Sequence, residues 1–211
     1  MRYALVGDSQ GQGVFGPLAS YLQAAGHVVV LSRAVPGKAP AWWAADTSLP
    51  GQLAGARPDV VVYLVAGNNT DLDPSSYARS AATLVGHARN AGARTVYWLS
   101  PALAVREPYA SYHNRTASLE PSILASLGAR WLDMRPLTTT GHRDDGVHFT
   151  SSAYQAWAAR LAPMLTASSP LAVLGAGAGT AWWWALPVAG VALFALVALR
   201  RRRGAVEYEE G

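Results

Sequence analysis

The sequence predicts an α/β fold: a flavodoxin-like three-layer α/β/α sandwich with a five-stranded parallel sheet, plus one C-terminal transmembrane helix. Short runs rich in β-branched and aromatic residues alternate with segments of helical length, which is typical of βαβ units. The run Val60–Val65 is apolar throughout, as expected of a central strand that is buried on both faces. A chain of 211 residues can bury one full core, so we expect one globular domain and an appendage.

The strands and helices can be assigned in chain order from these patterns. Five β-rich runs are expected to form the strands: Tyr3–Val6, Val28–Leu31, Val60–Val65, Thr95–Leu99 and Arg130–Leu132. Helices are expected over residues 13–25, 75–91, 109–127 and 151–166. In the last of these, Ala153, Trp157 and Leu161 recur near helical spacing, which predicts one buried face.

The pattern changes after residue 166. Residues 171–199 contain no charged residue, and three tryptophans and four arginines, Arg200 to Arg203, flank the most apolar part. An apolar run of about 20 residues with such flanks predicts a transmembrane helix, although a buried hairpin of the globular domain is the alternative. We therefore divide the chain into a globular domain (1–166), a Ser/Pro/Gly/Ala-rich linker (167–179), a transmembrane helix (180–199) and a basic-then-acidic tail (200–211).

The side of the membrane stays open at this point. The four arginines after the helix favour a cytoplasmic C-terminus, which would leave the globular domain outside. The apolar run that starts at Tyr3 is too short for the apolar region of a signal peptide, so we expect no cleavable export signal, which favours the opposite orientation.

Composition excludes several classes of function. Residues 1–169 carry 13 basic and 10 acidic residues, a net charge of +3, so we expect no nucleic-acid partner. The chain contains no cysteine, which excludes disulfides, thiolate metal sites and thiol catalysis.

Chemically capable residues follow four of the five predicted strands. Because the carboxyl ends of parallel strands meet at one edge of a sheet, we expect these residues to lie close together. The segments are Gly7-Asp8-Ser9-Gln10, then the loop with Gly37, then Ala66-Gly67-Asn68-Asn69, and finally a loop with Asp145-Gly146-Val147-His148.

Together these residues predict a nucleophilic serine. A serine hydroxyl needs a base to accept its proton, and the base needs a third group to fix its tautomer. Ser9 is the expected nucleophile, His148 the base and Asp145 the orienting carboxylate. An oxyanion would be stabilised by the Ser9 N–H, the Gly37 N–H and the Asn68 side-chain amide. This mechanism requires neither a metal ion nor an organic cofactor.

The sequence resembles the SGNH (GDSL-like) hydrolase family over about residues 1–166. The four segments correspond to its blocks in order and in comparable separation, most strongly from Asp145 through Thr150 and the helix that follows. The resemblance implies a serine esterase, lipase, thioesterase or carbohydrate O-deacetylase, acting on polysaccharide O-acetyl groups or lipid-like esters. Beside a membrane anchor, it mildly favours envelope polysaccharide or lipid substrates.

Two departures from the family pattern leave alternatives open. Gln10 replaces the leucine of the first block, and the third block reads Ala66–Asn69 instead of Gly-x-Asn-Asp. Counting along the strand aligns Asn68 with the oxyanion asparagine, whereas a literal Gly-x-Asn match would select Asn69. The changed third block also supports a second class of function, a membrane-tethered binding or structural protein without turnover.

Other motifs have weaker functional interpretations. The run Gly11–Gly16 matches the G-x-G-x-x-G of dinucleotide sites, but no acidic residue lies between Asp8 and Asp46 to bind the ribose. Trp42 and Trp43 could form an acyl or sugar platform or could pack in the core. The remaining histidines are expected to be solvated or structural: His27, His87, His113 and His142.

Overall fold

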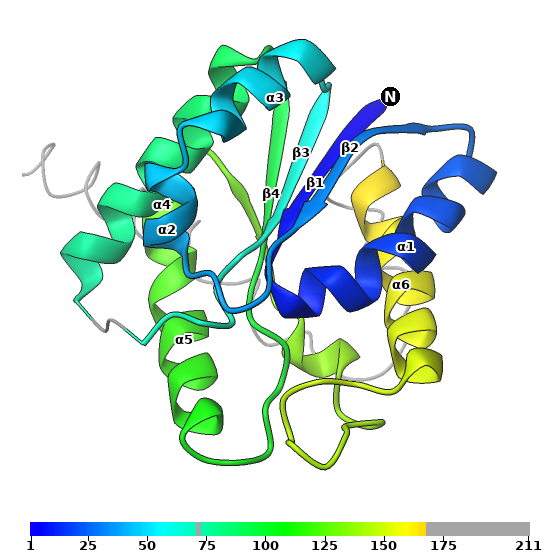
Figure 1. The fold of residues 1–211 in the computed structure, drawn as a ribbon, viewed down its shortest axis with the longest axis vertical. Coiled ribbons are helices and arrows are strands. Elements are labelled where there is room, and N and C mark those ends of the chain that lie inside the picture. The colour runs from blue at the N-terminus through cyan, green and yellow to red at the C-terminus, as the bar shows by residue number, and fades with distance from the viewer. Residues whose placement is uncertain (71–72, 168–211) are drawn as a thin grey trace, which may run out of the picture. The chain divides into compact units, whose positions relative to one another are not determined.

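The computed structural model describes residues 1–70 and 73–167, and Figure 1 shows their arrangement. The strands are β1 (Arg2–Gly7), β2 (Val28–Ala34), β3 (Val60–Leu64), β4 (Thr95–Leu99) and β5 (Arg130–Leu132). The helices are α1 (Ser9–Ala24), α2 (Pro40–Ala45), α3 (Ser48–Ala56), α4 (Pro74–Asn90), α5 (Tyr109–Ser126), the 3-10 helix η1 (Arg135–Leu137) and α6 (Ser151–Thr166).

The five strands form one parallel sheet in the order β2-β1-β3-β4-β5. This is the flavodoxin-like order: β2 is added on one side of β1, and β3, β4 and β5 are added in turn on the other side. Helices α1 and α6 cover one face, and α2 to α5 lie on the other (Figure 1). The predicted three-layer α/β/α sandwich with five parallel strands is therefore confirmed for the described residues.

Successive side chains of the central strands enter opposite cores. Tyr3 and Leu5 of β1 pack with α1 and α6, whereas Ala4 and Val6 pack with the helices of the other face. All four are fully buried. Each large apolar side chain buried in this way contributes about 1.5–3 kcal/mol relative to exposure. The continuous apolar runs in the sequence follow from this two-sided burial.

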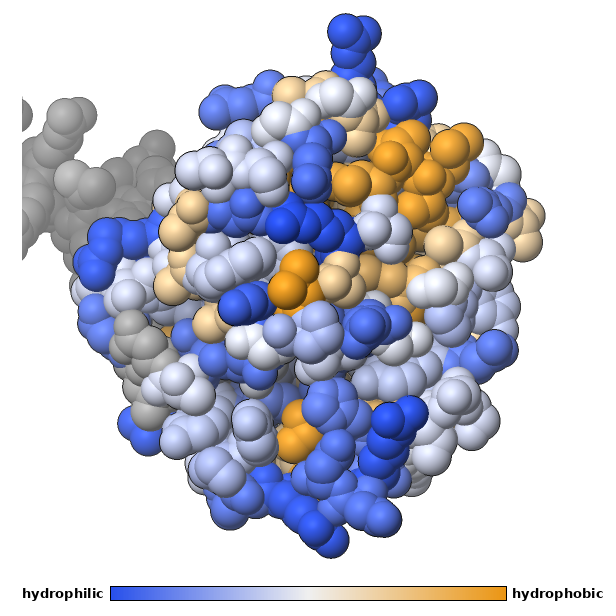
Figure 2. Space-filling model, in the orientation of Figure 1, coloured by the Kyte–Doolittle hydropathy of each residue, from blue (hydrophilic) through white to orange (hydrophobic). Residues whose placement is uncertain are grey.

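Three details differ from the sequence-based expectation. Helix α1 begins at Ser9 rather than at residue 13, because the Asp8 carboxylate caps it by accepting the Gln10 N–H. The short helices α2 and α3, which have few periodic apolar residues, were not predicted. Strand β2 continues to Ala34 instead of ending at Leu31. It is an edge strand whose Val28 is 55% exposed, and Figure 2 shows apolar atoms gathered over this part of the surface.

The predicted membrane helix at 180–199 lies outside the described residues, as do the tail and nearly all of the linker. Within residues 1–70 and 73–167, every helix is too short or too polar to cross a membrane.

Candidate active site

Ser9 is the first residue of α1, immediately after β1. The preceding Asp8 is fully buried, and its two carboxylate oxygens accept the Gln10 N–H and the Gly67 N–H, each at 2.9 Å. Burial raises the pKa of Asp8 to about 6, against the opposing effect of these hydrogen bonds. The carboxylate thus fixes the turn that presents Ser9, whose own N–H lies in the first helical turn and has no intrahelical acceptor.

Asp145 and His148 form a compact unit in the loop before α6. One Asp145 oxygen accepts the backbone N–H groups of Val147 and His148 at 2.8 Å, and the other lies 2.8 Å from His148 Nδ1. These bonds, that from the His148 backbone above all, hold the pKa of Asp145 well below its ordinary range. The ionised carboxylate therefore favours the histidine tautomer that carries its proton on Nδ1.

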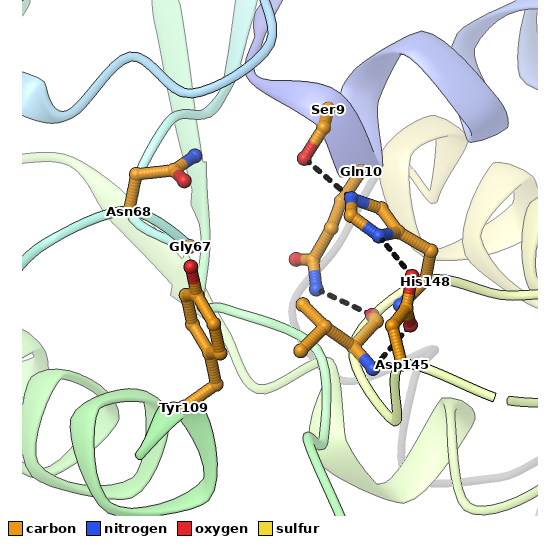
Figure 3. A pocket seen from close by; sticks show the side chains of 8 residues that line it. Ser9, Gln10, Gly67, Asn68, Tyr109, Asp145 and His148 are labelled. Carbon is orange, nitrogen blue, oxygen red and sulfur yellow. Dashed lines mark hydrogen bonds and ion pairs between the residues drawn. The ribbon is translucent and has the colours of Figure 1, made fainter. Parts of the chain in front are cut away.

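The other ring nitrogen of His148 faces the serine. His148 Nε2 lies 2.9 Å from Ser9 Oγ, across 139 residues of sequence, as the dashed line in Figure 3 shows. With its proton on Nδ1, the ring can accept the serine proton at Nε2. The hydroxyl, the imidazole and the carboxylate are thus aligned in an order that is chemically suited to acyl transfer.

Two cavities adjoin this chain of hydrogen bonds, and Ser9, Asn68 and His148 line both of them. The smaller has a volume of about 200 Å³ and includes Tyr109 and Val147, as Figure 3 shows in part. The larger has a volume of about 520 Å³ and adds these residues: Gln12, Gly13, Pro36, Gly37, Arg143 and Tyr154. The structure therefore brings together all five predicted site residues.

The neighbouring asparagines have different surroundings. Asn68 lies across the cavity from Ser9 (Figure 3), which suits an oxyanion donor. Asn69 is only 5% exposed, and its Nδ2 donates to Thr116 Oγ1 at 3.2 Å, away from both cavities. The geometry favours the assignment made by strand count over the literal Gly-x-Asn match.

Several residues around the site were not predicted from the sequence, and three of them lie close to Ser9 or Asn68. Tyr109 forms part of the cavity wall, Gln10 is buried beside Ser9, and His113 is buried against the loop that bears Asn68. A signal existed for His113, because it shares the buried face of α5 with Thr116 and Glu120 at helical spacing. Polar residues on a buried face usually have specific partners.

The tryptophan pair and the glycine-rich run lie where packing explains them. Trp43 is fully buried in the core, and Trp42 lies beneath Lys38; neither lines the two cavities, so the platform interpretation is not supported. The run Gly11–Gly16 lies inside α1, where Gly13 packs against the ring of Tyr154. No loop is left there to hold a dinucleotide phosphate. Among the described residues, no cluster of three metal-ligating side chains is found.

The remaining histidines divide between surface and structure. His27 packs against Tyr3, and His142 Nε2 lies 2.7 Å from the Leu103 carbonyl. His87 is partly buried, and burial lowers its pKa. These three fit the expected solvated or structural roles, and they lie outside both cavities.

Comparison with known proteins finds similarity in fold. No family model and no curated protein matches the sequence. Among 58 matching chains of solved structures, TesA has a TM-score of 0.64 and 22% identity, covering 79% of this chain and 98% of TesA.

Two other matching structures are of esterases. The inhibitor-bound aryl esterase of M. smegmatis has a TM-score of 0.62 and 17% identity, covering 78% of this chain and 97% of that one. Est24, a carbohydrate acetylesterase from Sinorhizobium meliloti, has a TM-score of 0.61 and 14% identity, covering 78% and 98%. At such identities the chain shares the three-layer fold of these proteins.

Proposed function

We propose that this protein is a serine esterase that hydrolyses carboxylic esters through an acyl-enzyme, with Ser9 as nucleophile, His148 as base and Asp145 as orienting carboxylate. The observation that carries the proposal is the continuous chain from Ser9 Oγ through the His148 ring to Asp145 Oδ2, at 2.9 and 2.8 Å. The resemblance to SGNH hydrolases and the fold shared with solved esterases support it.

The first half-reaction follows from the positions of these groups. Ser9 Oγ attacks the ester carbonyl carbon as its proton moves to His148 Nε2, and the carbonyl electron pair moves onto oxygen. The ionised Asp145 stabilises the resulting imidazolium. The oxyanion is bound by the Ser9 N–H at the start of α1, the Gly37 N–H and the Asn68 amide, which act where charge develops.

The first half-reaction ends when the tetrahedral intermediate collapses: the bond to the alcohol oxygen breaks, and that oxygen takes the proton from His148 Nε2 as it leaves. The second half-reaction regenerates the enzyme. Water attacks the acyl carbon as its proton moves to His148 Nε2, and collapse of this second intermediate breaks the bond to Ser9 Oγ, which takes the proton back from His148 as the acid is released. No redox partner or co-reactant other than water is needed for this balance.

Cavity size and lining point to esters with a small acyl group. Binding sites for drug-sized ligands are about 300–1,000 Å³. The cavity of about 200 Å³ beside Tyr109 and Val147 is smaller and suits a short acyl chain. The larger one, with the side chains of Gln12 and Arg143, suits a polar alcohol such as a sugar. We therefore include O-acetyl groups of carbohydrates among the proposed substrates.

The test is hydrolysis of p-nitrophenyl acetate, butyrate and a long-chain ester by the full chain and by Ser9→Ala, His148→Ala and the double variant. Acetate and butyrate should be preferred, and each single variant should lose most activity. Because the two residues act as one unit, the double variant should be hardly slower than either single one. Multiplying losses would contradict the shared mechanism, and equal rates for wild type and Ser9→Ala would favour a tethered binding protein.

We further propose that residues 180–199 anchor the protein to a membrane as a single-pass helix. The support is in the sequence: an uncharged stretch over 171–199, aromatic residues at one end and Arg200 to Arg203 at the other.

A further inference from the structure

A buried chain of hydrogen bonds connects the loop that bears Asn68 to the loop that bears His148. The His113 ring lies between two carbonyl oxygens, with Nε2 2.9 Å from Gly67 O and Nδ1 2.7 Å from Ala102 O. The Ala102 N–H donates to Gln10 Oε1 at 3.1 Å, and Gln10 Nε2 donates to Val147 O at 3.4 Å. We call the Gln10 side chain, the Ala102 peptide groups and the His113 side chain the Ala102 brace.

The brace ends on residues next to the site in sequence. Gly67 directly precedes Asn68, and Val147 directly precedes His148. Figure 3 shows the Gln10 side chain reaching from the start of α1 toward the loop of Asp145 and His148. Gln10 and His113 are each only 1% exposed; Gln10 borders the smaller cavity, whereas His113 lines neither cavity.

All four polar atoms of the two side chains lie within hydrogen-bond distance of backbone groups in loops around the site, and the neutral His113 ring donates to one of its two carbonyl partners. A buried polar group is costly unless it is paired, and a core without function could fill the same space with apolar side chains. The leucine that the resemblance implies at position 10 would do so. Here two buried polar side chains connect three loops, which other contacts also join, such as Val105 N to Gly146 O and the His142 ring to the Leu103 carbonyl.

The Gly67 residue is held from both sides. Its N–H donates to the Asp8 carboxylate at 2.9 Å, and its carbonyl faces His113 Nε2. Fixing both peptide groups leaves Asn68 little freedom of position. Since oxyanion donors must be in place before charge develops, a small displacement of Asn68 would weaken the transition state more than the bound substrate.

We propose that His113 and Gln10 are positioning residues of the esterase, with His113 fixing the oxyanion asparagine through the Gly67 carbonyl and Gln10 fixing the His148 loop through the Val147 carbonyl. The inference rests on the proposed function. It requires a proton on His113 Nε2. Because both partners are carbonyl oxygens, only the imidazolium donates to both of them. Burial lowers the pKa of His113 and favours the neutral ring, which with its proton on Nε2 donates to the Gly67 carbonyl alone.

A matched pair of substitutions separates the two bonds of His113. An asparagine amide nitrogen occupies about the position of Nδ1, and a glutamine amide nitrogen about that of Nε2. His113→Asn can therefore donate to the Ala102 carbonyl but not to the Gly67 carbonyl, whereas His113→Gln can donate to the Gly67 carbonyl but not to the Ala102 carbonyl. Gln10→Met is the third variant, because it fills similar volume without either hydrogen bond.

The readouts are kcat and KM for p-nitrophenyl acetate on the full chain, normalised to active sites titrated with an organophosphate, together with thermal melting. His113→Asn should lower kcat roughly 10- to 100-fold with KM nearly unchanged, as expected for a misplaced catalytic group. His113→Gln should restore most of kcat. Gln10→Met should also lower kcat, because it removes the hydrogen bond to the Val147 carbonyl that holds the His148 loop.

Three results would overturn the inference. The first is a folded His113→Asn variant whose kcat equals that of wild type. The second is an equal loss of kcat in His113→Asn and His113→Gln, because a histidine with only a structural role would not distinguish these two variants. The third, should His113→Asn fail to fold, is unchanged kcat in Gln10→Met together with a loss in His113→Gln. An inactive wild type would instead refute the proposed function itself, and the inference with it.

Discussion

Replacing each of the adjacent asparagines by alanine should separate activity from stability. Asn68 lines both cavities with Ser9, so Asn68→Ala removes a proposed oxyanion donor. Removing one such donor costs about 10²–10³-fold in kcat, or about 2.7–4 kcal/mol of transition-state stabilisation. KM should change little, since the interaction strengthens only as charge develops on the carbonyl oxygen.

The same change one position later should act on folding. Asn69 is buried and donates to Thr116 Oγ1, so Asn69→Ala leaves that hydroxyl without its partner. An unsatisfied buried polar group costs about 1–3 kcal/mol. For a domain of this size each kcal/mol lowers Tm by about 2–4 °C. The kcat of Asn69→Ala should stay close to that of wild type.

The assay is initial-rate hydrolysis of p-nitrophenyl acetate normalised to active sites, with melting followed by circular dichroism. Each variant is the control for the other, because the side chain removed is identical. If Asn69→Ala lost kcat and Asn68→Ala did not, the literal Gly-x-Asn match would be right and the strand count wrong. A Tm loss in Asn68→Ala as large as in Asn69→Ala would refute the reasoning from burial.

Three further predictions concern packing, pH and the C-terminus. A Cβ at Gly13 would overlap the Tyr154 ring, so Gly13→Ala should lower Tm through overpacking. Gly86 lies in α4 with open space around it, so Gly86→Ala should instead raise the free energy of unfolding by about 0.5–1 kcal/mol. Thermal melting of both variants checks this, and a rise in the Tm of Gly13→Ala equal to that of Gly86→Ala would refute it. Burial raises the pKa of Glu120 to about 7, from an ordinary 4.5, so the folded protein favours the protonated carboxyl. The resulting stabilisation is fully present below about pH 4.5 and is lost as the pH rises to about 7, so the free energy of unfolding of wild type should fall by roughly 3 kcal/mol more than that of Glu120→Gln over this range. Urea titrations at several pH values check this, and an equal pH dependence of the two proteins would contradict it. Truncation after residue 169 should give a detergent-free domain that keeps esterase activity, while the full chain should need detergent; a detergent-free full-length monomer in gel filtration would end the anchor hypothesis.

The strands were predictable because burial on both faces leaves a mark in the sequence itself. Val60–Val65 is apolar at every position, and β3 lies in the centre of the sheet with every side chain buried. The start of α1 was not, since glycines at 11 and 13 weaken the helical pattern. There the helix depends on its Asp8 cap and on packing against α6, and the latter is a tertiary effect that no local pattern contains.

The site divides in the same way. Ser9, Asp145 and His148 could be assigned because their chemistry is tied to position after a strand and to a three-residue spacing. The partners of Gln10 and His113 could not, since they are peptide groups of loops that approach only in the folded chain. A backbone carbonyl has no residue-specific signature, so sequence alone cannot name it as a partner.

The compact unit of Asp145 and His148 changes how the site is assembled during folding. The carboxylate fixes the imidazole through three bonds within four residues, so base and orienting group arrive as one piece. Assembly of the three functional groups therefore requires only two distant parts of the chain to come together, the start of α1 and the loop before α6. Because α1 and α6 pack directly against each other, through Gly13 and Tyr154 among others, the contact that builds the core also sets the distance between serine and histidine. The entropy cost of closing the long loop between Ser9 and His148 is therefore offset by the apolar interface of this helix pair, and the reacting groups incur no separate cost of that kind.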